Sequence, residues 1–328
     1  MSNSCIHKLL GDILNEENRT LDIEEALSLY EIEDKDILDL LSAANKVKLK
    51  YKGKKVNLCS IINAKSGRCP EDCKFCAQSS YYPTEISTYP LLPAEKITES
   101  AKKAYEMGAR EFSIVTSGKG IKTKKEIDTI KEAVSKIKEE DISPCASLGI
   151  LSYETLKELK EAGLSNYHHN LETSKNFFPN ICSTHNYEED ILAVKNAKKL
   201  GFYICSGGIF GIGESKKDRI ELALTLAELD VNSVPMNFLN PIKSTPLENE
   251  RNLAPFEILK TIAIFRLILK TKDIVICGGR VINLRDLHPF VLLAGANGLL
   301  TGNYLTTQGR NPLDDRQMIL DLQLELPE

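Results

Sequence analysis

The chain has 328 residues, a formal net charge of −4, 42% apolar residues and 27% charged residues. This composition is typical of a globular protein, and the absence of a basic tail or patch argues against nucleic-acid binding. No run approaches the roughly 20 apolar residues that span a bilayer, and the N-terminus lacks the features of a signal peptide, so we expect a cytoplasmic protein that does not act at a membrane.

Residues 1–50 carry apolar residues at spacings of three and four, which predicts helices. Asp34 or Asp36 can begin the second of these helices. We expect this segment to form a helical arm or cap outside the main repeat. Residues 51–328 then form the main unit, which ends in a C-terminal tail.

Strand-like and helix-like runs alternate through the rest of the chain. Such alternation predicts a parallel sheet, and eight units favour a closed (β/α)8 TIM-type barrel of the α/β class over an open doubly wound sheet. The eight strand-like runs are 56–63, 111–118, 143–150, 165–171, 202–211, 232–239, 273–279 and 297–302.

In such a barrel, chemistry collects at the carboxyl ends of the strands. The polar loop 239–255 carries three prolines, and we expect it to lie over the barrel mouth. The side chains that fall inside or just after strand runs are Cys145, His168, His169, Asn170, Cys205, Asn237, Cys277 and Arg280.

Cysteine is the second informative feature, because nine cysteines in a reducing compartment indicate metal or redox ligands. Cys69, Cys73 and Cys76 follow the first strand at C-x3-C-x2-C spacing. Three thiolates can hold three corners of an iron–sulfur cubane and leave the fourth iron open to a ligand. The alternative is a zinc site completed by a distant His or Cys.

This spacing, with Phe75 before the last cysteine, resembles the radical S-adenosylmethionine superfamily. Longer motifs resemble the biotin synthase family within it, and the similarity extends from about residue 20 to about residue 325. The motifs are NAKSGRCPEDCKFCAQSSYY (63–82), YHHNLETS (167–174), ICSGGIFGIGE (204–214), VPMNFLNPIKSTPLE (234–248) and GGRVINLRDLHPFVLLAGANGLLTGNYLTT (278–307).

The resemblance implies that Cys69, Cys73 and Cys76 hold a [4Fe–4S] cluster, shielded by Phe75, whose open iron binds S-adenosyl-L-methionine. Cleavage of this cofactor gives a 5′-deoxyadenosyl radical, which abstracts hydrogen from dethiobiotin. A second, auxiliary cluster supplies sulfur, which makes the enzyme a sulfurtransferase that forms biotin. The resemblance also implies a flavodoxin or ferredoxin as electron donor and a homodimer.

The auxiliary site departs from the family pattern, which is a [2Fe–2S] cluster held by three strand cysteines and one arginine. Cys145, Cys205 and Arg280 match that pattern, but the third cysteine position holds Ser113. We predict that Cys277 replaces the lost ligand, with Arg280 nearby or ligating. The cluster is then a rearranged [2Fe–2S] cluster or a four-iron cubane that carries an extra sulfide; alternatively, Cys277 is an ordinary buried thiol.

The remaining cysteines are weaker candidates. We expect Cys59 to be a core residue, and Cys5 lies in the N-terminal arm. Cys182 follows the fourth strand and is the most plausible spare ligand.

The resemblance also assigns residues that bind the cofactor and the substrate. Asn170 and Glu172 suit ribose hydroxyls, and Asn170 and Asn237 suit the ureido ring of dethiobiotin. Asp190 stands where many members have an arginine that binds the carboxylate of S-adenosylmethionine, so this contact is left unassigned. The residues placed beside the adenine are Gly207, Gly208, Ile209, Gly211 and Glu214.

Two other functions remain open at this point. One is a radical S-adenosylmethionine enzyme on the same barrel that acts on a different small molecule. The other is a non-catalytic iron–sulfur or zinc protein. The barrel cysteines, with Asn170 and Asn237, favour the biotin synthase reading over both.

Overall fold

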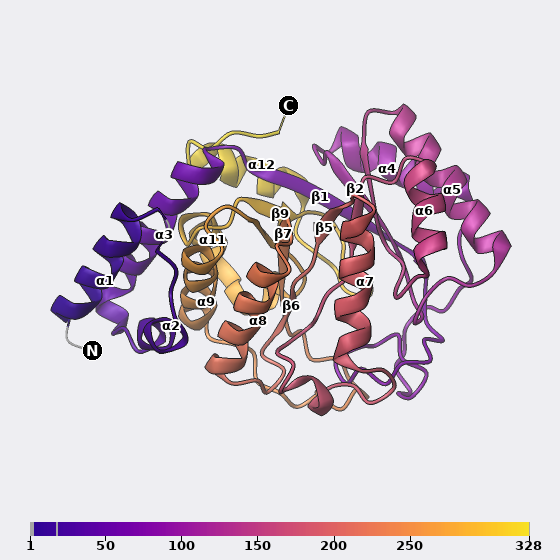
Figure 1. Cartoon of the computed structure of the whole chain (residues 1–328). Helices are drawn as coiled ribbons and strands as arrows, with labels where there is room; N and C mark the ends of the chain where they lie inside the picture. The colour runs from indigo at the N-terminus through magenta and orange to yellow at the C-terminus, as the bar shows by residue number, and fades with distance from the viewer. Residues whose placement is uncertain (1–2, 18, 328) are drawn as a thin grey trace.

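The computed structural model describes residues 3–17 and 19–327, with side chains from His7 onward. Parallel strands form a closed barrel surrounded by helices, with the N-terminal helices packed on one flank (Figure 1). The predicted α/β barrel is therefore confirmed. The strands are β1 (Asn57–Lys65), β2 (Glu111–Thr116), β3 (Ser143–Ser147), β4 (Asn166–His168), β5 (Tyr203–Cys205), β6 (Gly208–Phe210), β7 (Ser233–Phe238), β8 (Asp273–Ile276) and β9 (Gly298–Leu300).

Helices follow the strands and cover the outside of the barrel. Several begin with capping boxes, such as Thr123 with Glu126 and Ser215 with Asp218, which satisfy the free N–H groups of the first turn. The helices are α4 (Ala94–Glu106), α5 (Lys124–Glu139), α6 (Tyr153–Glu161), α7 (Tyr187–Lys199), α8 (Lys216–Glu228), α9 (Pro255–Ile268), α10 (Arg280–Leu284), α11 (His288–Leu293) and α12 (Pro312–Asp321).

One predicted strand is divided in the structure. The run 202–211 forms β5 and β6, with a break at Ser206 and Gly207. The nine strands of the described residues therefore occupy eight positions around the barrel, which we call staves. The barrel closes at this break, where Cys205 pairs with Ser233 and the Ser206 N–H donates to the Ser233 carbonyl over 2.9 Å. The division follows from a close approach of β5 to β7.

The N-terminal segment consists of α1 (Asn3–Asn15), α2 (Ile23–Tyr30) and α3 (Ile37–Lys52). It packs on α9, where the Tyr30 hydroxyl donates to Thr261 over 3.2 Å. Helix α9 is buried along nearly its whole length because it lies between this arm and the barrel. The arm is thus outside the repeat, as predicted, and is packed tightly against it.

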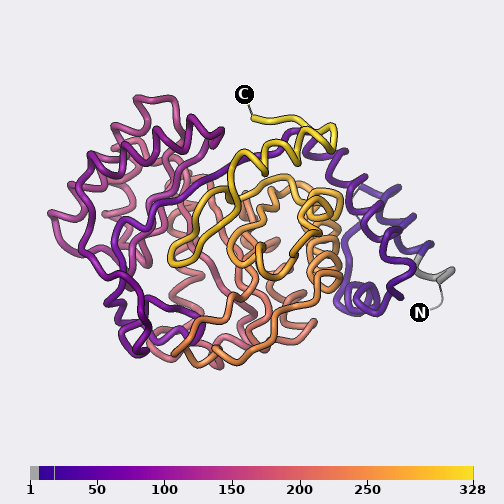
Figure 2. Tube along the Cα trace, turned by 180° about the vertical axis from the view of Figure 1, so that it is seen from behind, coloured from indigo at the N-terminus to yellow at the C-terminus, as the bar shows by residue number. Residues whose placement is uncertain are grey.

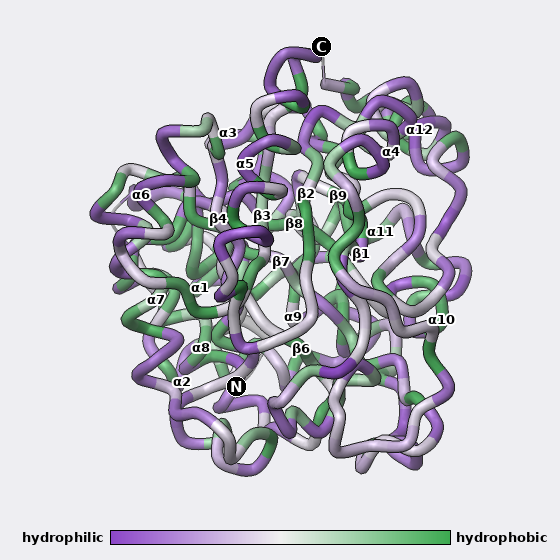
Figure 3. Tube along the Cα trace, turned by 90° about the vertical axis from the view of Figure 1, so that its right-hand side faces the viewer, coloured by the Kyte–Doolittle hydropathy of each residue, from purple (hydrophilic) through white to green (hydrophobic). Residues whose placement is uncertain are grey.

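The two ends of the main unit meet beside the barrel. Figure 2 shows the C-terminal segment, in yellow, running along the barrel towards the N-terminal arm. Glu325 forms a bridge with Lys55, just before β1. The strands are mostly hydrophobic and the outer turns hydrophilic (Figure 3), and no helix of the described residues is long and apolar enough to cross a membrane.

Candidate active site

A cavity of about 340 Å³ occupies the barrel interior, from the first residues of β1, β2 and β8 to the loops beyond the carboxyl ends of the strands. Inward-facing side chains alternate along each strand, as in Glu111, Ser113 and Val115 of β2. Leu239 and Ile242, from the predicted mouth loop 239–255, also line the cavity. The space is enclosed on most sides, which suits chemistry that must exclude water.

The cysteine loop follows β1 and turns back on itself. The Cys76 N–H donates to the Cys73 carbonyl over 2.9 Å, and the Cys69 N–H donates to the Gln78 carbonyl over 3.0 Å. Phe75 and Cys76 line the cavity. Burial raises the pKa of Cys69, and it raises the pKa of Cys76 to about 11, so both are neutral thiols until a cation favours the thiolate.

The loop after β4 binds to the cysteine loop. The Lys74 N–H donates to the Ile181 carbonyl over 2.9 Å, and Asp72 accepts hydrogen bonds from the Ser183 N–H and hydroxyl. Cys182 Sγ lies 3.9 Å from Cys73 Sγ. Of the two weaker candidates whose side chains the structure describes, Cys59 and Cys182, Cys182 is therefore the one that lies beside the loop; the side chain of Cys5 lies outside the described residues.

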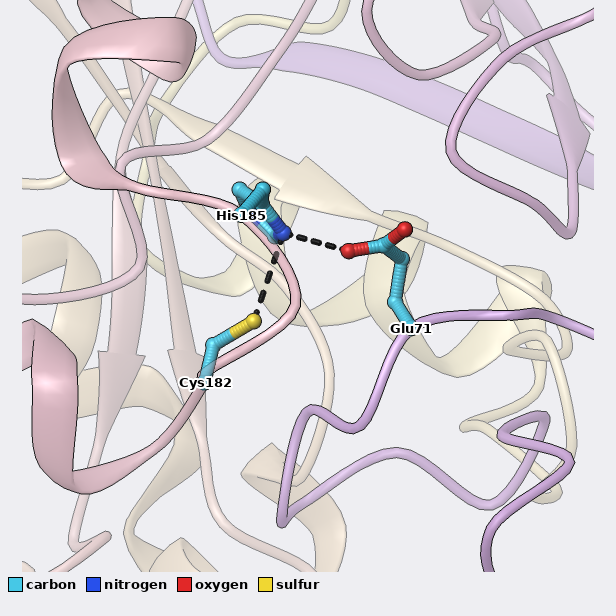
Figure 4. Close-up of side chains that lie close together, drawn as sticks. All are labelled: Glu71, Cys182 and His185. Atoms are coloured by element: carbon cyan, nitrogen blue, oxygen red, sulfur yellow. Dashed lines mark hydrogen bonds and ion pairs between the residues drawn. The ribbon is translucent and has the colours of Figure 1, made fainter.

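Glu71, Cys182 and His185 form a buried cluster at this junction (Figure 4). His185 Nδ1 is 2.5 Å from Glu71 Oε2 and 3.3 Å from Cys182 Sγ, and His185 Nε2 is 3.4 Å from Asp190 Oδ2. Burial alone lowers the pKa of His185, but its bonds to Asp190, Cys182 and Glu71 outweigh burial and raise it to about 11. His185 is therefore a protonated imidazolium, so the cluster includes a positively charged side chain beside the cysteine loop.

Asp190 is buried between two histidines. His169 Nε2 lies 2.8 Å from Asp190 Oδ1, on the opposite side from His185. Burial raises the pKa of Asp190, but its bonds to both imidazoles outweigh burial and lower it. An acidic residue is tolerated at this position because His185 supplies positive charge nearby, and no sequence pattern indicates this pairing.

The glycine motif shapes the backbone more than it faces the cavity. A Cβ on Gly207 would meet the Pro235 carbonyl oxygen at 2.0 Å, and one on Gly208 would meet the Glu172 carbonyl oxygen at 2.3 Å. These glycines permit strands to approach each other. Of the residues that sequence reasoning placed beside the adenine, namely Gly207, Gly208, Ile209, Gly211 and Glu214, Ile209 is the one that lines the cavity.

Glu214 closes the turn that follows β6. Its carboxylate accepts from the Gly211 N–H over 2.9 Å and the Ile212 N–H over 2.8 Å, and it pairs with Arg219 Nε at 2.6 Å. Both carboxylate oxygens of Glu214 therefore accept hydrogen bonds from groups of the chain itself. Glu214 therefore positions the turn.

Asn170, Glu172 and Asn237, which the resemblance assigns to cofactor and substrate binding, all line the cavity. Strand β4 ends at His168, so Asn170 and Glu172 lie beyond it, and Glu172 adopts a left-handed backbone (φ 65°). Asn170 Nδ2 donates to Glu172 over 3.3 Å. Burial, and then the nearby charge of Asp190, raise the pKa of Glu172 to about 8.

Four cysteines face the deeper part of the cavity: Cys59, Cys145, Cys205 and Cys277. Cys59, predicted to be a core residue, packs against the buried cluster of Val275, Cys277 and Leu300, and the pleat of β1 also turns it towards the cavity with Asn57 and Ile61. All eight cysteines whose side chains are described are free of disulfides.

Ser113 and Arg280 lie near these thiols. The Ser113 hydroxyl is buried and finds no hydrogen-bond partner among the described residues. Arg280 Nη1 donates to Asp315 over 3.1 Å, and its Nη2 donates to the Leu300 carbonyl over 3.2 Å and also to Asp315. Cavity-facing thiols next to an unsatisfied hydroxyl fit a site that holds a further group.

Comparison with known proteins agrees with this geometry. The Radical SAM superfamily profile matches residues 64–226, and the Biotin and Thiamin Synthesis associated domain profile matches residues 235–325. The biotin synthase of Geotalea daltonii is 52% identical over 317 residues, which cover 96% of this chain and 94% of that protein. The biotin synthase of Endomicrobium trichonymphae is 55% identical over 305 residues, covering 92% and 93%.

Solved structures support the fold. Methylornithine synthase superposes with a TM-score of 0.84 at 22% identity, covering 98% of this chain and 97% of that one. The FeFe-hydrogenase maturase from Carboxydothermus hydrogenoformans gives 0.82 at 18% identity, covering 98% and 79%. At these low identities the superpositions show that the barrel fold is shared, and no more. The family is shown by the sequence relatives that match over nearly the full length. The chain belongs to the biotin synthase family of radical S-adenosylmethionine enzymes.

Proposed function

We propose that this enzyme converts dethiobiotin to biotin inside the barrel, with one thiol set at the mouth and another deeper in the same cavity. The observation that carries the proposal is this shared space, which Cys76 and Phe75 line together with Cys145, Cys205 and Cys277. A substrate bound between the two sets can meet both without leaving the enclosure.

Cys69, Cys73 and Cys76 are the proposed ligands of the [4Fe–4S] cluster. When bound with S-adenosyl-L-methionine, this cluster supplies the 5′-deoxyadenosyl radical. Phe75 covers the cluster loop on the cavity side. The bonds between residues 71–74 and 181–185 hold the loop in place, so its cysteines need little rearrangement on binding.

Cys145, Cys205 and Cys277 are the proposed ligands of the auxiliary cluster, of the [2Fe–2S] or four-iron type. Cys277 takes the role that Ser113 cannot fill, because a hydroxyl is a harder and weaker iron ligand than a thiolate. Arg280 remains a cation beside Cys277, since Asp315 pairs with its guanidinium. That charge stabilises the thiolate of Cys277.

Asn170 and Asn237 are the proposed contacts of the ureido ring, and Asn170 and Glu172 of the ribose. Asn237 Oδ1 accepts from the Gly278 N–H over 3.0 Å, which fixes the orientation of the amide. With its pKa near 8, Glu172 is protonated at neutral pH and can donate a hydrogen bond.

We further propose a homodimer, cytoplasmic location and an electron donor of the flavodoxin or ferredoxin type. The domain division remains a helical arm over residues 1–50 and a catalytic barrel over 51–328, with α3 carrying the arm to Lys52. Ile209 is the proposed adenine contact, held in place by Gly207, Gly208, Gly211 and Glu214.

The test is S-adenosylmethionine cleavage under anoxic conditions with and without dethiobiotin. The proposal predicts that deoxyadenosine and biotin form only when dethiobiotin is present. Cleavage that is indifferent to dethiobiotin would assign the chain to another substrate, and no cleavage by the cluster-loaded protein would remove the enzymatic role.

A further inference from the structure

Four thiols approach the cavity from alternate staves of the barrel. Cys59 lies on β1, Cys145 on β3, Cys205 on β5 and Cys277 directly after β8. With β5 and β6 counted as one interrupted strand, these are the first, third, fifth and seventh of eight staves. In a barrel of this type, the inward side chains of alternate strands fill one layer together.

The strand register places three of the thiols at one level. Cys59 pairs with Glu111, which pairs with Ser143 on β3. Because the stagger of such a barrel is about one residue per strand, the residue of β3 level with Cys59 lies two positions beyond Ser143 and is Cys145. The same step, taken through β4, leads from Cys145 to Cys205.

The fourth thiol lies two residues nearer the mouth, in the next layer that odd-numbered staves form. Cys205 pairs with Ser233, which pairs with Asp273 on β8, so the level residue of β8 is Val275. Cys277 lies two positions further on, and its N–H donates to the Met236 carbonyl over 2.9 Å. Three thiols at one level and a fourth nearer the mouth are not coplanar, and each comes from a different strand, as one protein ligand for each iron of a cubane requires.

Ser113 does not belong to this set. It lies on β2, an even stave, and therefore in the layer between the three level thiols and Cys277. The four cysteines on the first, third, fifth and seventh staves supply four ligands. The cluster then needs neither a cysteine on β2 nor an arginine as ligand. This explains why Arg280 can be committed to Asp315.

Cys59 has the surroundings of its three neighbours. It is half-buried and packs beside the apolar side chains of Val275 and Leu300, as a cysteine that fills space also would. It differs from such a cysteine because it shares the cavity wall with three other thiols, which a bound iron cluster would stabilise as thiolates.

We propose that Cys59 is the fourth thiolate ligand of the auxiliary cluster, together with Cys145, Cys205 and Cys277, and that this cluster holds four irons. The inference rests on the auxiliary site of the proposed function and adds both a ligand and the nuclearity.

The test measures iron in a full-length parent in which Cys69, Cys73 and Cys76 are changed to alanine, so that only the auxiliary site can be loaded. After anoxic reconstitution we expect about four irons per chain in this parent. Adding Cys59→Ala should lower the count to about three or fewer and give the EPR signal of an oxidised three-iron cluster, because one iron loses its protein ligand.

Two variants calibrate the result. Cys145→Ala should lose iron in the same way, and Cys182→Ala, which changes a buried cysteine of the loop after β4, should keep the parent's count. Circular dichroism checks that each variant is folded. If Cys59→Ala does not fold, Cys59→Ser keeps the side-chain volume and should change the Mössbauer parameters of one iron site.

The outcomes separate the two proposals. A Cys59→Ala variant with the parent's iron count and Mössbauer spectrum overturns the inference and leaves the proposed function standing. A parent with about two irons also overturns it, in favour of a [2Fe–2S] site. A parent that binds no iron removes the auxiliary site itself, and the inference with it.

Discussion

Glu172 is a half-buried carboxyl group that lines the cavity, and the fold disfavours its charge. Burial and the charge of Asp190 raise its pKa from 4.5 to about 8, and Asn170 offers it one hydrogen bond. Between these two values the folded protein keeps a proton that the unfolded chain releases. The contribution of this group to the free energy of unfolding is therefore largest below pH 4.5, and it decreases as the pH rises to about 8.

Glu172→Gln should remove this dependence. The variant keeps the hydrogen-bonding shape but does not titrate, so its stability relative to the wild type should grow by about 1 kcal/mol per pH unit across the window. Urea unfolding of both proteins, prepared without clusters, measures the difference. Glu154→Gln, which changes an exposed carboxyl group on α6, is the control. If the free energy of unfolding of Glu172→Gln changed with pH as steeply as that of the wild type, the proposed protonated carboxyl group would be contradicted.

At the scale of elements, the break between β5 and β6 decides how the barrel closes. Gly207 sits where the chain passes so close to β7 that a Cβ would meet the Pro235 carbonyl oxygen at 2.0 Å. That oxygen belongs to the backbone and cannot move aside cheaply. The glycine-rich sequence therefore reflects strand packing as well as any contact with a cofactor.

Gly207→Ala should destabilise the protein by about 3 kcal/mol or prevent it from folding, because the added methyl group forces β5 and β7 apart. Gly11→Ala is the matched control, since a Cβ there meets nothing within 4 Å and alanine favours a helix. Thermal unfolding followed by circular dichroism measures both. Equal stability of the two variants would show that the closure tolerates a side chain.

At the scale of the whole molecule, the N-terminal arm is part of one cooperative core. Leu40 of α3 is fully buried in the same hydrophobic cluster as the residues of α9, whereas Leu38 is 61% exposed. The Lys48 amine also donates to the Leu292 carbonyl over 2.9 Å. Loss of packing in the arm should therefore be felt by the barrel.

Leu40→Ala should lower the free energy of unfolding by about 3 kcal/mol, from lost burial and the cavity that remains. Leu38→Ala should change it by less than about 0.5 kcal/mol. A single unfolding transition, seen equally by circular dichroism and by the fluorescence of the tyrosines, is expected for both. A separate early transition in Leu40→Ala would mean that the arm unfolds independently.

Much of the architecture could be predicted because it depends on local pattern. Apolar periodicity and the alternation of strand and helix are properties of short segments, and the cysteine loop carries its three cysteines within eight residues, from Cys69 to Cys76. The break in 202–211 was missed, because it depends on the distance between two strands that are neighbours in space, and β4 is shorter than the predicted run 165–171.

The sequence by itself determined the fold class, the family and the cysteine loop, since each is written in contiguous residues. The tertiary structure alone decided which side chains share the cavity. It turned Cys59 inward, placed His185 on Asp190 and brought Cys182 to 3.9 Å from Cys73, across more than a hundred residues of chain. The physical reason is that a barrel brings together residues by stagger and layer, and neither is visible until the strands are paired.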